Sequence, residues 1–547
     1  MSIHGGFHIG YVNQLLRSVI PPENVVLPGY EANIYWLYHA LLATIVKIFN
    51  IAAPLASTIL NIFALIGSLY WINRILDQLD LKYKNTFIIS CYAIFILLGL
   101  NLFSPIHLLM HYFEKGNIFP DNFLSSINRW STVLMGDIRL SNLLRKFLNF
   151  SGFPIGVMYY IAALYYAISI LKEKLTLNKI LLLMLSVAGT LVFHATTGLF
   201  TITTVLFALI ITILFFKISD LKESFQTLKA FEWFVLIATF LFLLPIFYYL
   251  YLGSKAMPTS PVITTDFIYS LRSIVSSAYP LAILALLGFY FSKTRINELL
   301  LFLVIVIFLG YSLSLLVDMP DNNQYKYMLL SPIPLCILIV ILLDNSCFYS
   351  SARMKVAWKV LFTIVTIFLF LKVMIIGINY RSSRLFSNQS YYYNNKHISL
   401  KSGTPYKDAY EWIRENTPEQ TIVILPLEPK DPGKIFSITD RLPYVVCGHF
   451  FALGINEYYK RAENVMQFYG DKTPPRNFAC KGLSEIETTE KDSIIKSNIL
   501  NEFKKFNSER PSVLFIPKNK LDNILVDEKI LEMIYSDKEA NIYRFKD

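Results

Sequence analysis

The amino-acid sequence predicts a polytopic α-helical membrane protein that ends in an extracytoplasmic α/β domain. The chain of 547 residues is 54% hydrophobic and only 16% charged, which is too apolar for an ordinary soluble protein. About ten apolar runs, each close to the length of a membrane helix, lie between residues 52 and 379. From Tyr380 onward the composition becomes polar, which predicts a separate domain.

The membrane helices are predicted from apolar runs of about 20 residues, the length that crosses a hydrocarbon core of about 30 Å. The predicted spans are 52–73, 86–103, 154–171, 180–194, 198–216, 231–252, 277–292, 298–317, 328–343 and 357–379. Two of these runs meet at His194. Their combined length favours two helices, and the alternative is one long broken helix with a re-entrant turn.

The loop charges predict the orientation. Alternate loops are rich in lysine and arginine, which the positive-inside rule assigns to the cytoplasm. They carry Arg74, Lys82, Lys84, Lys172, Lys174, Lys179, Lys217, Lys222, Lys229, Lys293, Arg295, Arg353, Lys355 and Lys359. The N-terminal segment and the C-terminal domain then lie outside. This scatter also explains the net charge of +11 without a nucleic-acid partner, because the sequence has no basic stripe.

Three regions are expected along the chain. Residues 1–50 form an extracytoplasmic loop with amphipathic helices, residues 51–380 form the transmembrane domain with an outer loop at 104–153, and residues 381–547 form the α/β domain. The first 32 residues are too polar to span a membrane and lack the apolar region of a signal peptide. We therefore expect that Met1 is an internal methionine of a longer protein whose first transmembrane helix is absent from this sequence.

The C-terminal domain alternates between helical and strand patterns, which predicts a compact α/β fold. The expected elements are a helix at 406–416, strands at 421–427, 442–446, 512–517 and 541–545, and a helix near 521–535. A domain of about 150 residues is large enough for one independent core.

Short motifs at both ends of the chain resemble those of GT-C-type polytopic membrane glycosyltransferases and their uncharacterised bacterial relatives. In the C-terminal domain they are residues 406–418, Thr439-Asp440-Arg441 and Tyr458-Tyr459-Lys460-Arg461. In the N-terminal segment they are Phe7-His8-Ile9-Gly10, Ile20-Pro21-Pro22-Glu23, Gly29 and residues 35–39.

This resemblance implies a transferase that moves a sugar from a polyprenyl-phosphate carrier to an unknown acceptor outside the cytoplasm, in cell-envelope glycan or glycoprotein synthesis. It implies membrane lipid and the polyprenyl-phosphate-linked sugar as partners. It also implies a bacterial inner or plasma membrane location and a divalent metal ion, Mg²⁺ or Mn²⁺, as a cofactor whose ligands the sequence does not identify.

Such a transfer needs a carboxylate that deprotonates the acceptor or holds a metal against the donor phosphate. The family's acid lies where the first helix enters the first outer loop, but no aspartate precedes Asp77, and this loop offers only Glu23 and Glu31. Either an upstream segment carries the acid, or the chain is not a transferase of the usual type. Of the two glutamates, Glu31 is the candidate acid.

The other candidate acid is Asp137 in the predicted outer loop. Arg139 follows it closely and Arg129 precedes it, so an acid for a metal or acceptor lies beside cations for a phosphate. The alternative is an amphipathic interfacial helix with a solvated charged face. His107 and His111 have the spacing of metal ligands on a helix, but a pair without a third ligand is a weak signal.

Three further candidates lie at the membrane surface or in the soluble domain. His194 is an ionisable group at membrane depth, and the alternative is a satisfied interfacial histidine. Lys326 precedes a predicted span on the outer side, where it would meet the phosphate of a lipid carrier, or it would anchor the helix end by snorkelling. Arg441 could bind the same phosphate from the soluble domain, or it could be held by ion pairs within that domain.

Other functional classes have less support. The sequence has no phosphate-binding loop of the Walker type, no dinucleotide fingerprint, no HExxH motif and no nucleophile elbow. It has no detectable internal repeat and few charges in the middle of the spans, which argues against a transporter. The remaining alternatives are a flippase for a lipid-linked precursor and a non-catalytic assembly protein with the same fold.

The cysteines add one expectation. The predicted topology leaves Cys447 and Cys480 as the two cysteines on the outer side, where an oxidising compartment would allow them to form a disulfide. Closing this loop would stabilise the domain by about 3 to 4 kcal/mol in the chain-entropy model. The alternative is a pair of free thiols, with Cys447 in the core.

Overall fold

The structure is a computed structural model of the 547-residue chain. It describes residues 3–30, 36–81, 86–99, 143–147, 150–173, 176–217, 262–263, 267–292, 297–318, 325–345, 406–427, 438–446, 456–471, 492–524 and 526–546, with positions 237, 360, 363–365, 367 and 369–371. The chain divides into two compact units, which are described separately. Unit 1 comprises Met1–Thr58, Gly253–Thr259 and Ser383–Asp547, and unit 2 comprises Ile59–Leu252 and Ser260–Ser382.

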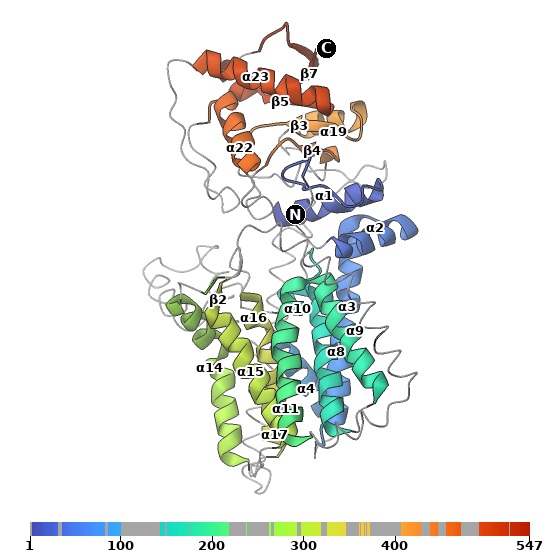
Figure 1. The fold of residues 1–547 in the computed structure, drawn as a ribbon, viewed down its shortest axis with the longest axis vertical. Helices are drawn as coiled ribbons and strands as arrows, with labels where there is room; N and C mark the ends of the chain where they lie inside the picture. The colour runs from blue at the N-terminus through green and yellow to red at the C-terminus, as the bar shows by residue number, and fades with distance from the viewer. Residues whose placement is uncertain are drawn as a thin grey trace. The chain divides into compact units, whose positions relative to one another are not determined.

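Unit 2 is built mainly from apolar helices (Figure 1). They are α3 (Ala53–Gln78, which begins in unit 1), α4 (Thr86–Leu98), α7 (Leu144–Phe147), α8 (Phe153–Lys172), α9 (Leu177–Phe193), α10 (Ala195–Thr201), a π-helical turn η2 (Ile202–Leu206), α11 (Phe207–Phe216), α14 (Phe267–Phe291), α15 (Glu298–Leu316), α16 (Tyr325–Leu330) and α17 (Pro332–Asp344). Strands β1 (Val262–Ile263) and β2 (Val317–Asp318) pair antiparallel.

Five helical segments are long and apolar enough to cross a membrane within the part of the chain that the structure describes. They are Ala53–Gln78, Phe153–Lys172, Ala195–Phe216, Glu298–Leu316 and Tyr325–Asp344. Shorter apolar helices lie at Thr86–Leu98, Leu177–Phe193 and Ala278–Phe291. The predicted spans from 52–73 to 328–343 therefore fall on helices wherever the structure describes them. The spans 231–252 and 357–379 lie almost wholly outside the described residues, and the number of spans stays a prediction.

The two predicted helices that meet at His194 are separate helices in the structure. His194 is the single residue between α9 and α10, and it adopts an extended conformation with φ −157° and ψ 92°. The chain can reverse here because Gly198 has no side chain: a Cβ at this position would lie 2.6 Å from the Cα of Leu191. The turn therefore brings α10 directly against α9.

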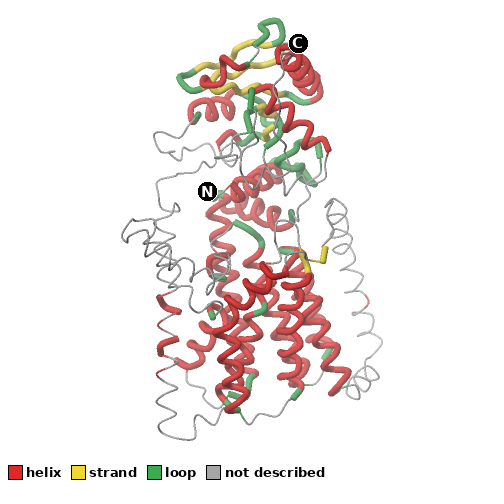
Figure 2. The backbone as a smooth tube through the Cα atoms, turned by 90° about the vertical axis from the view of Figure 1, so that its left-hand side faces the viewer, coloured by secondary structure: helices red, strands yellow, loops and turns green. Residues whose placement is uncertain are grey.

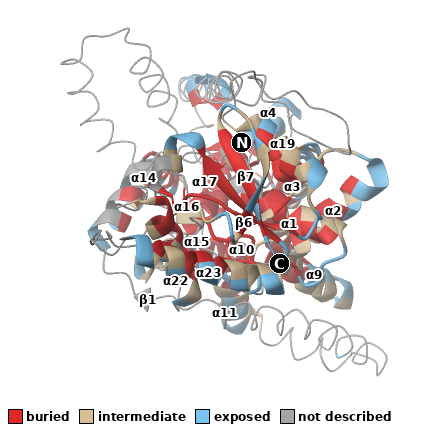
Figure 3. Ribbon diagram, turned by 90° about the horizontal axis from the view of Figure 1, so that it is seen from above, coloured by how far each residue is buried: buried red, intermediate tan, exposed pale blue. Residues whose placement is uncertain are grey.

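The core of unit 2 lies where α8, α10, α15, α16 and α17 meet. Every residue of α17 is buried, so the helix lies in the protein interior and is drawn in red in Figure 3. Phe200 of α10 stacks on Tyr327 of α16, with ring centroids 5.3 Å apart, and meets the edge of Tyr160 of α8 at 5.6 Å. These aromatic contacts join α10 to both neighbouring helices.

Unit 1 combines the N-terminal segment with the C-terminal domain. Its helices are α1 (Ile3–Leu16), α2 (Leu37–Phe49), α19 (Lys407–Asn416), α22 (Asn456–Tyr469) and α23 (Asp492–Glu509), and a 3₁₀-helix η7 spans Lys518–Asn523. Its strands are β3 (Ile422–Ile424), β4 (Leu442–Pro443), β5 (Ser512–Pro517), β6 (Leu531–Ser536) and β7 (Ala540–Phe545). Figure 2 shows these strands in yellow.

The five strands form one mixed sheet in the order β4-β3-β5-β7-β6. Strand β3 pairs parallel with β4 and β5, whereas β7 pairs antiparallel with β5 and β6. All six residues of β5 are buried, which is typical of a central strand covered on both faces. Helix α19 covers part of the sheet. The ring centroid of Tyr410 lies 5.2 Å from that of Phe515 in β5, and the ring centroid of Trp412 lies 5.2 Å from that of Tyr535 in β6.

The N-terminal segment is part of the core of unit 1. Phe7, Tyr11 and residues 25–27 are buried in the same hydrophobic cluster as the sheet and its helices. The backbone N–H of Val446 donates to the carbonyl of Val26 at 3.4 Å, so the two segments also meet through the main chain. An ion pair between Arg510 and Glu23 at 2.7 Å adds a further contact between the N-terminal segment and the C-terminal part of unit 1. Unit 1 is therefore a domain made from both parts of the sequence.

Most elements predicted for the C-terminal domain are confirmed, but the prediction of a helix near 521–535 is wrong. This stretch contains the end of the 3₁₀-helix η7 and then most of strand β6. Its apolar residues have helical spacing, but β6 pairs with β7 along the edge of the sheet, and this pairing overrides the local pattern. The sequence-based prediction also missed helices α22 and α23, which pack against each other.

Candidate functional site

The candidate site of unit 2 begins with a contact between His194 and Lys326. The Nζ of Lys326 lies 3.1 Å from the Nε2 of His194, although 132 positions separate the two residues. His194 is placed by the turn between α9 and α10, and Lys326 by the first turn of α16. Both side chains are partly exposed, so a ligand could reach them. The structure thus brings together two of the residues that the sequence predicted.

A second lysine joins this pair through Tyr325. The Nζ of Lys146, on the short helix α7, donates to the hydroxyl of Tyr325 at 2.6 Å and lies 4.5 Å from the centre of its ring. Tyr325 directly precedes Lys326 in α16, so Lys146 contacts the same helical turn that carries Lys326. We call Lys146, His194, Tyr325 and Lys326 the cationic cluster. Two ammonium groups and an imidazole on three elements form a surface that attracts an anion.

The positive charges of the cluster affect His194. This residue lies between α9 and α10, at the end of the predicted span 180–194. Desolvation, followed by the charges of Lys326 and Lys146, holds the pKa of His194 well below its usual value. The imidazole is therefore neutral at physiological pH, and it acts as a hydrogen-bonding group without a charge of its own.

Arg441 is held inside unit 1, where it closes the end of α19. Its side chain donates to the carbonyl oxygens of Arg414 and Thr417 at 3.0 and 2.6 Å and to the Oγ1 of Thr417 at 3.3 Å. Carbonyl groups at the end of a helix lack partners within the helix, so an arginine side chain stabilises them. Burial lowers the pKa of Arg441. These contacts give Arg441 a structural role, which it fills through carbonyl and hydroxyl oxygens and not through the ion pairs that were the stated alternative.

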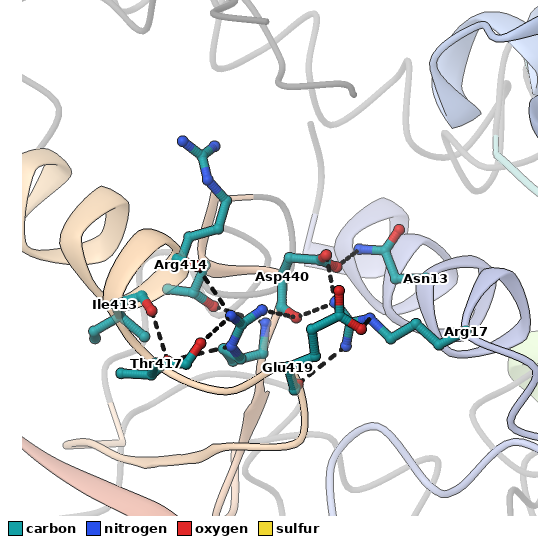
Figure 4. Close-up of polar contacts among 9 residues, drawn as sticks. Asn13, Arg17, Ile413, Arg414, Thr417, Glu419 and Asp440 are labelled. Atoms are coloured by element: carbon teal, nitrogen blue, oxygen red, sulfur yellow. Dashed lines mark hydrogen bonds and ion pairs between the residues drawn. The ribbon is translucent and has the colours of Figure 1, made fainter. Parts of the chain in front are cut away.

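Next to Arg441, Asp440 joins the C-terminal part of unit 1 to helix α1 (Figure 4). Its carboxylate pairs with the guanidinium of Arg17 and accepts a hydrogen bond from the side chain of Asn13. Arg17 also donates to the carbonyl of Asp440 at 2.7 Å. Burial raises the pKa of Asp440, whereas Arg17 opposes this rise. This network is a clamp between two segments of unit 1.

The remaining predicted site residues lie outside the described residues. They are Glu31, Arg129, Asp137 and Arg139, together with the predicted metal-spaced pair His107 and His111 and the predicted disulfide partners Cys447 and Cys480. Among the described residues no group of three potential metal ligands comes together. The cationic cluster itself would repel a divalent cation, so the described side chains do not fit the expected Mg²⁺ or Mn²⁺.

Sequence reasoning missed parts of this site. Lys146 follows Asp137 in the sequence, but nothing there links it to Tyr325, 179 positions away. Tyr325 was overlooked, although an aromatic residue next to a lysine at a predicted membrane boundary is a usable signal. Thr197 was not identified either, although its backbone N–H and its hydroxyl both contact the Nδ1 of His194.

Comparisons with known proteins place the fold. No protein-family model matches the chain, and no curated protein matches it. The chain is similar to the crystal structure of ArnT from Cupriavidus metallidurans in the apo state, with a TM-score of 0.50 and 9% identity over 98% of this chain and 92% of that chain. It is less similar to the archaeal oligosaccharyltransferase AglB from Archaeoglobus fulgidus, with a TM-score of 0.35 and 15% identity over 85% and 64% of the two chains. The second similarity is too low to relate the folds.

The similarity to ArnT extends over nearly the whole chain, including both units. Together with the apolar helices of unit 2, it identifies an integral membrane protein. The chain therefore shares the fold of ArnT, which agrees with the fold that the sequence motifs led us to expect.

Proposed function

We propose that the chain is a glycosyltransferase that moves a sugar from a polyprenyl-phosphate carrier to an acceptor outside the cytoplasm, in the synthesis of a cell-envelope glycan or glycoprotein. The observation that carries this proposal is the cationic cluster at the ends of α7, α9 and α16. A phosphate on a lipid carrier is the anion that suits such a surface in a protein with this fold.

The chemistry requires one bond to form and one to break. The bond between the sugar and the carrier phosphate breaks, and the acceptor oxygen forms a new bond to the same carbon. Negative charge develops on the departing phosphate, so positioned ammonium groups lower the energy of the transition state. Lys146 and Lys326 take this role in the proposal.

The acceptor hydroxyl loses its proton during the transfer, so a general base is required. Asp137 is the proposed base, and Glu31 is the second candidate for the same role. The neutral imidazole of His194 is proposed to assist by hydrogen bonding within the cluster. Arg129 and Arg139 remain proposed phosphate ligands from the outer loop.

Phosphate binding is expected to depend on Lys326. Replacing Lys326 with alanine in the full-length protein should weaken the binding of a short-chain polyprenyl phosphate about 10- to 100-fold, because a hydrogen bond to a charged group contributes about 1.5 to 3 kcal/mol. Binding is measured with the protein in lipid nanodiscs. In a transfer assay with a lipid-linked sugar, both Lys326→Ala and Asp137→Asn should lower activity without lowering the amount of folded protein.

The matched control is Lys172→Ala. Lys172 lies in the last turn of α8, and its ammonium pairs with Asp80 at 2.7 Å, so it is a partly exposed lysine of the same unit that is not part of the cluster. This variant should bind polyprenyl phosphate as the unmodified protein does. Equal affinities for the Lys326 variant, the Lys172 variant and the unmodified protein would refute the proposed site. Binding without any transfer would instead support the flippase or assembly alternative.

The proposal also places the C-terminal domain outside the cytoplasm, because the cytoplasmic loops have the higher density of basic residues. The fusion site after Lys229 should lie in the cytoplasm, and the fusion site after Asn395 should lie on the extracytoplasmic side. Each fusion is tested with a fluorescent protein that folds in the cytoplasm and with a phosphatase that requires export. A cytoplasmic reading at Asn395 would reverse the whole orientation.

A further inference from the structure

Helix α2 of unit 1 has two apolar stripes, and only one of them is buried. The buried stripe packs toward α1, where the Nε2 of His39 lies 2.6 Å from the Nδ1 of His8. It consists of Tyr38, His39, Leu42, Ala43 and Val46. A second stripe runs beside it, because residues three or four positions apart lie on the same side of a helix. We call this second set the exposed stripe, and it consists of Leu41, Ile45, Ile48 and Phe49.

The exposed stripe leads into a helix that is long and apolar enough to cross a membrane. Ile48 is 68% exposed and Phe49 is 67% exposed. In the first turn of α3, Leu55 continues this surface and is 50% exposed. Helix α3 is one of the candidate spans. A continuous row of large exposed apolar residues indicates a contact with another apolar phase or partner, whereas single exposed residues need no such explanation.

The polar groups of α2 suit the edge of a bilayer. The hydroxyl of Thr44 donates to the carbonyl of Ala40 at 2.8 Å, so its donor is satisfied inside the helix and needs no water. The helix contains no aspartate or glutamate, and Lys47 is exposed in its last turn. A lysine can keep its methylene groups in an apolar layer while its ammonium group reaches the phosphates of lipid headgroups.

The length of α2 shows how it can meet a membrane. Its 13 residues span about 20 Å, which is too short to cross a hydrocarbon core of about 30 Å. The helix ends at Asn50, which has the left-handed conformation with φ 51° and ψ 46°, and α3 begins at Ala53. A short helix with one apolar side lies in the plane of the interface and does not span.

We propose that the exposed stripe is a lipid-binding surface, and that α2 lies in the membrane interface with Ile48 and Phe49 among the acyl chains and Lys47 at the phosphate groups. This inference goes beyond the proposed function, because it involves neither the sugar donor nor the acceptor. A second copy of the chain or a soluble protein could also cover an apolar stripe. Lipid is favoured because the stripe continues at Leu55 into a candidate span and because the charge beside it is positive.

The test replaces Phe49 with the photoreactive residue p-benzoylphenylalanine in the full-length protein, and Ile48 in a second variant. Each variant is illuminated in nanodiscs of phosphatidylcholine and phosphatidylglycerol. The excited benzophenone inserts into a C–H bond of its neighbour without losing any atoms, so contact with lipid is measured as a mass increase of one phospholipid on the intact protein. Fragmentation of the adduct should place the new bond on an acyl chain.

The matched control carries the same photoreactive residue in place of Ile494. This residue of α23 is also a helical isoleucine of unit 1, and it is 60% exposed. It should give no lipid adduct, because the proposal places no lipid at α23. A cross-link from position 48 or 49 to a second chain or to another protein would overturn the inference, as would lipid labelling no stronger than that at position 494. Both positions are exposed, so either variant decides the test if the other does not fold.

Discussion

Replacing Arg461 with alanine is expected to lower the free energy of unfolding of unit 1 by about 3 to 5 kcal/mol, the cost of removing one partner from a buried charged network. The guanidinium pairs with Glu457 at 3.1 Å and donates to the carbonyl of Pro28 at 3.0 Å. It also lies between two rings, 4.8 Å from the centre of Tyr444 and 5.0 Å from that of Phe506. Alanine would leave the carbonyl buried without this donor and would open the space between the rings.

The measurement is pulse proteolysis of the full-length protein in increasing urea, with the fragments of unit 1 followed on a gel. Arg544→Ala is the control. The side chain of Arg544 is 60% exposed, and it forms an ion pair with Glu532 at 2.7 Å. An exposed ion pair contributes only about 0 to 1 kcal/mol. Equal urea midpoints for the two variants would show that the buried position of Arg461 adds nothing to the free energy of unfolding of unit 1.

The second large effect is expected at Gly198, where even alanine is too large. A Cβ there would lie 2.5 Å from the Cδ2 and 2.6 Å from the Cα of Leu191. A backbone atom cannot move aside as a side chain can, so α9 and α10 must separate. We expect Gly198→Ala to destabilise unit 2 by about 1 to 3 kcal/mol through overpacking. It should also weaken polyprenyl phosphate binding, because His194 lies in the same turn.

Gly67→Ala provides a matched comparison. A Cβ at Gly67 would also be too close to a neighbour, but the nearest atoms are the Sδ and Cγ of Met158. An unbranched methionine side chain adopts other rotamers at little cost, so this variant should remain close to the unmodified protein. Thermal unfolding and phosphate binding are measured on both variants. A Gly198 variant that is as stable as the Gly67 variant would contradict the close packing of the two helices.

The sequence predicted those parts of the fold that depend on local patterns. The apolar run that ends at His194 and the buried strand at 512–517 carry their own signals of length and composition, and the structure confirms both. The prediction failed near 521–535, because the choice between helix and strand there is made by pairing with β7. That partner is not visible from the spacing of apolar residues.

The candidate site shows the same limit. Lys326 and His194 were selected one at a time, from their positions at predicted membrane boundaries, and their contact follows from the packing of α10 against α16. The role of Arg441 could not be foreseen, because it depends on which carbonyl groups end α19. Individual candidates can be identified in the sequence, but their grouping is a property of tertiary packing.

The composite core of unit 1 has a consequence for biosynthesis. The carbonyl of Pro28 and the side chain of Arg461 are 433 positions apart, and Glu23 and Arg510 are 487 apart. The ribosome therefore completes unit 2 long before the last strands of unit 1 exist. Until then Phe7, Tyr11 and residues 25–27 have no sheet to pack against, and their apolar surface is open to aggregation or to chaperones. The folding of unit 1 is thus a late step with a very high contact order, and it should be the slowest stage of maturation.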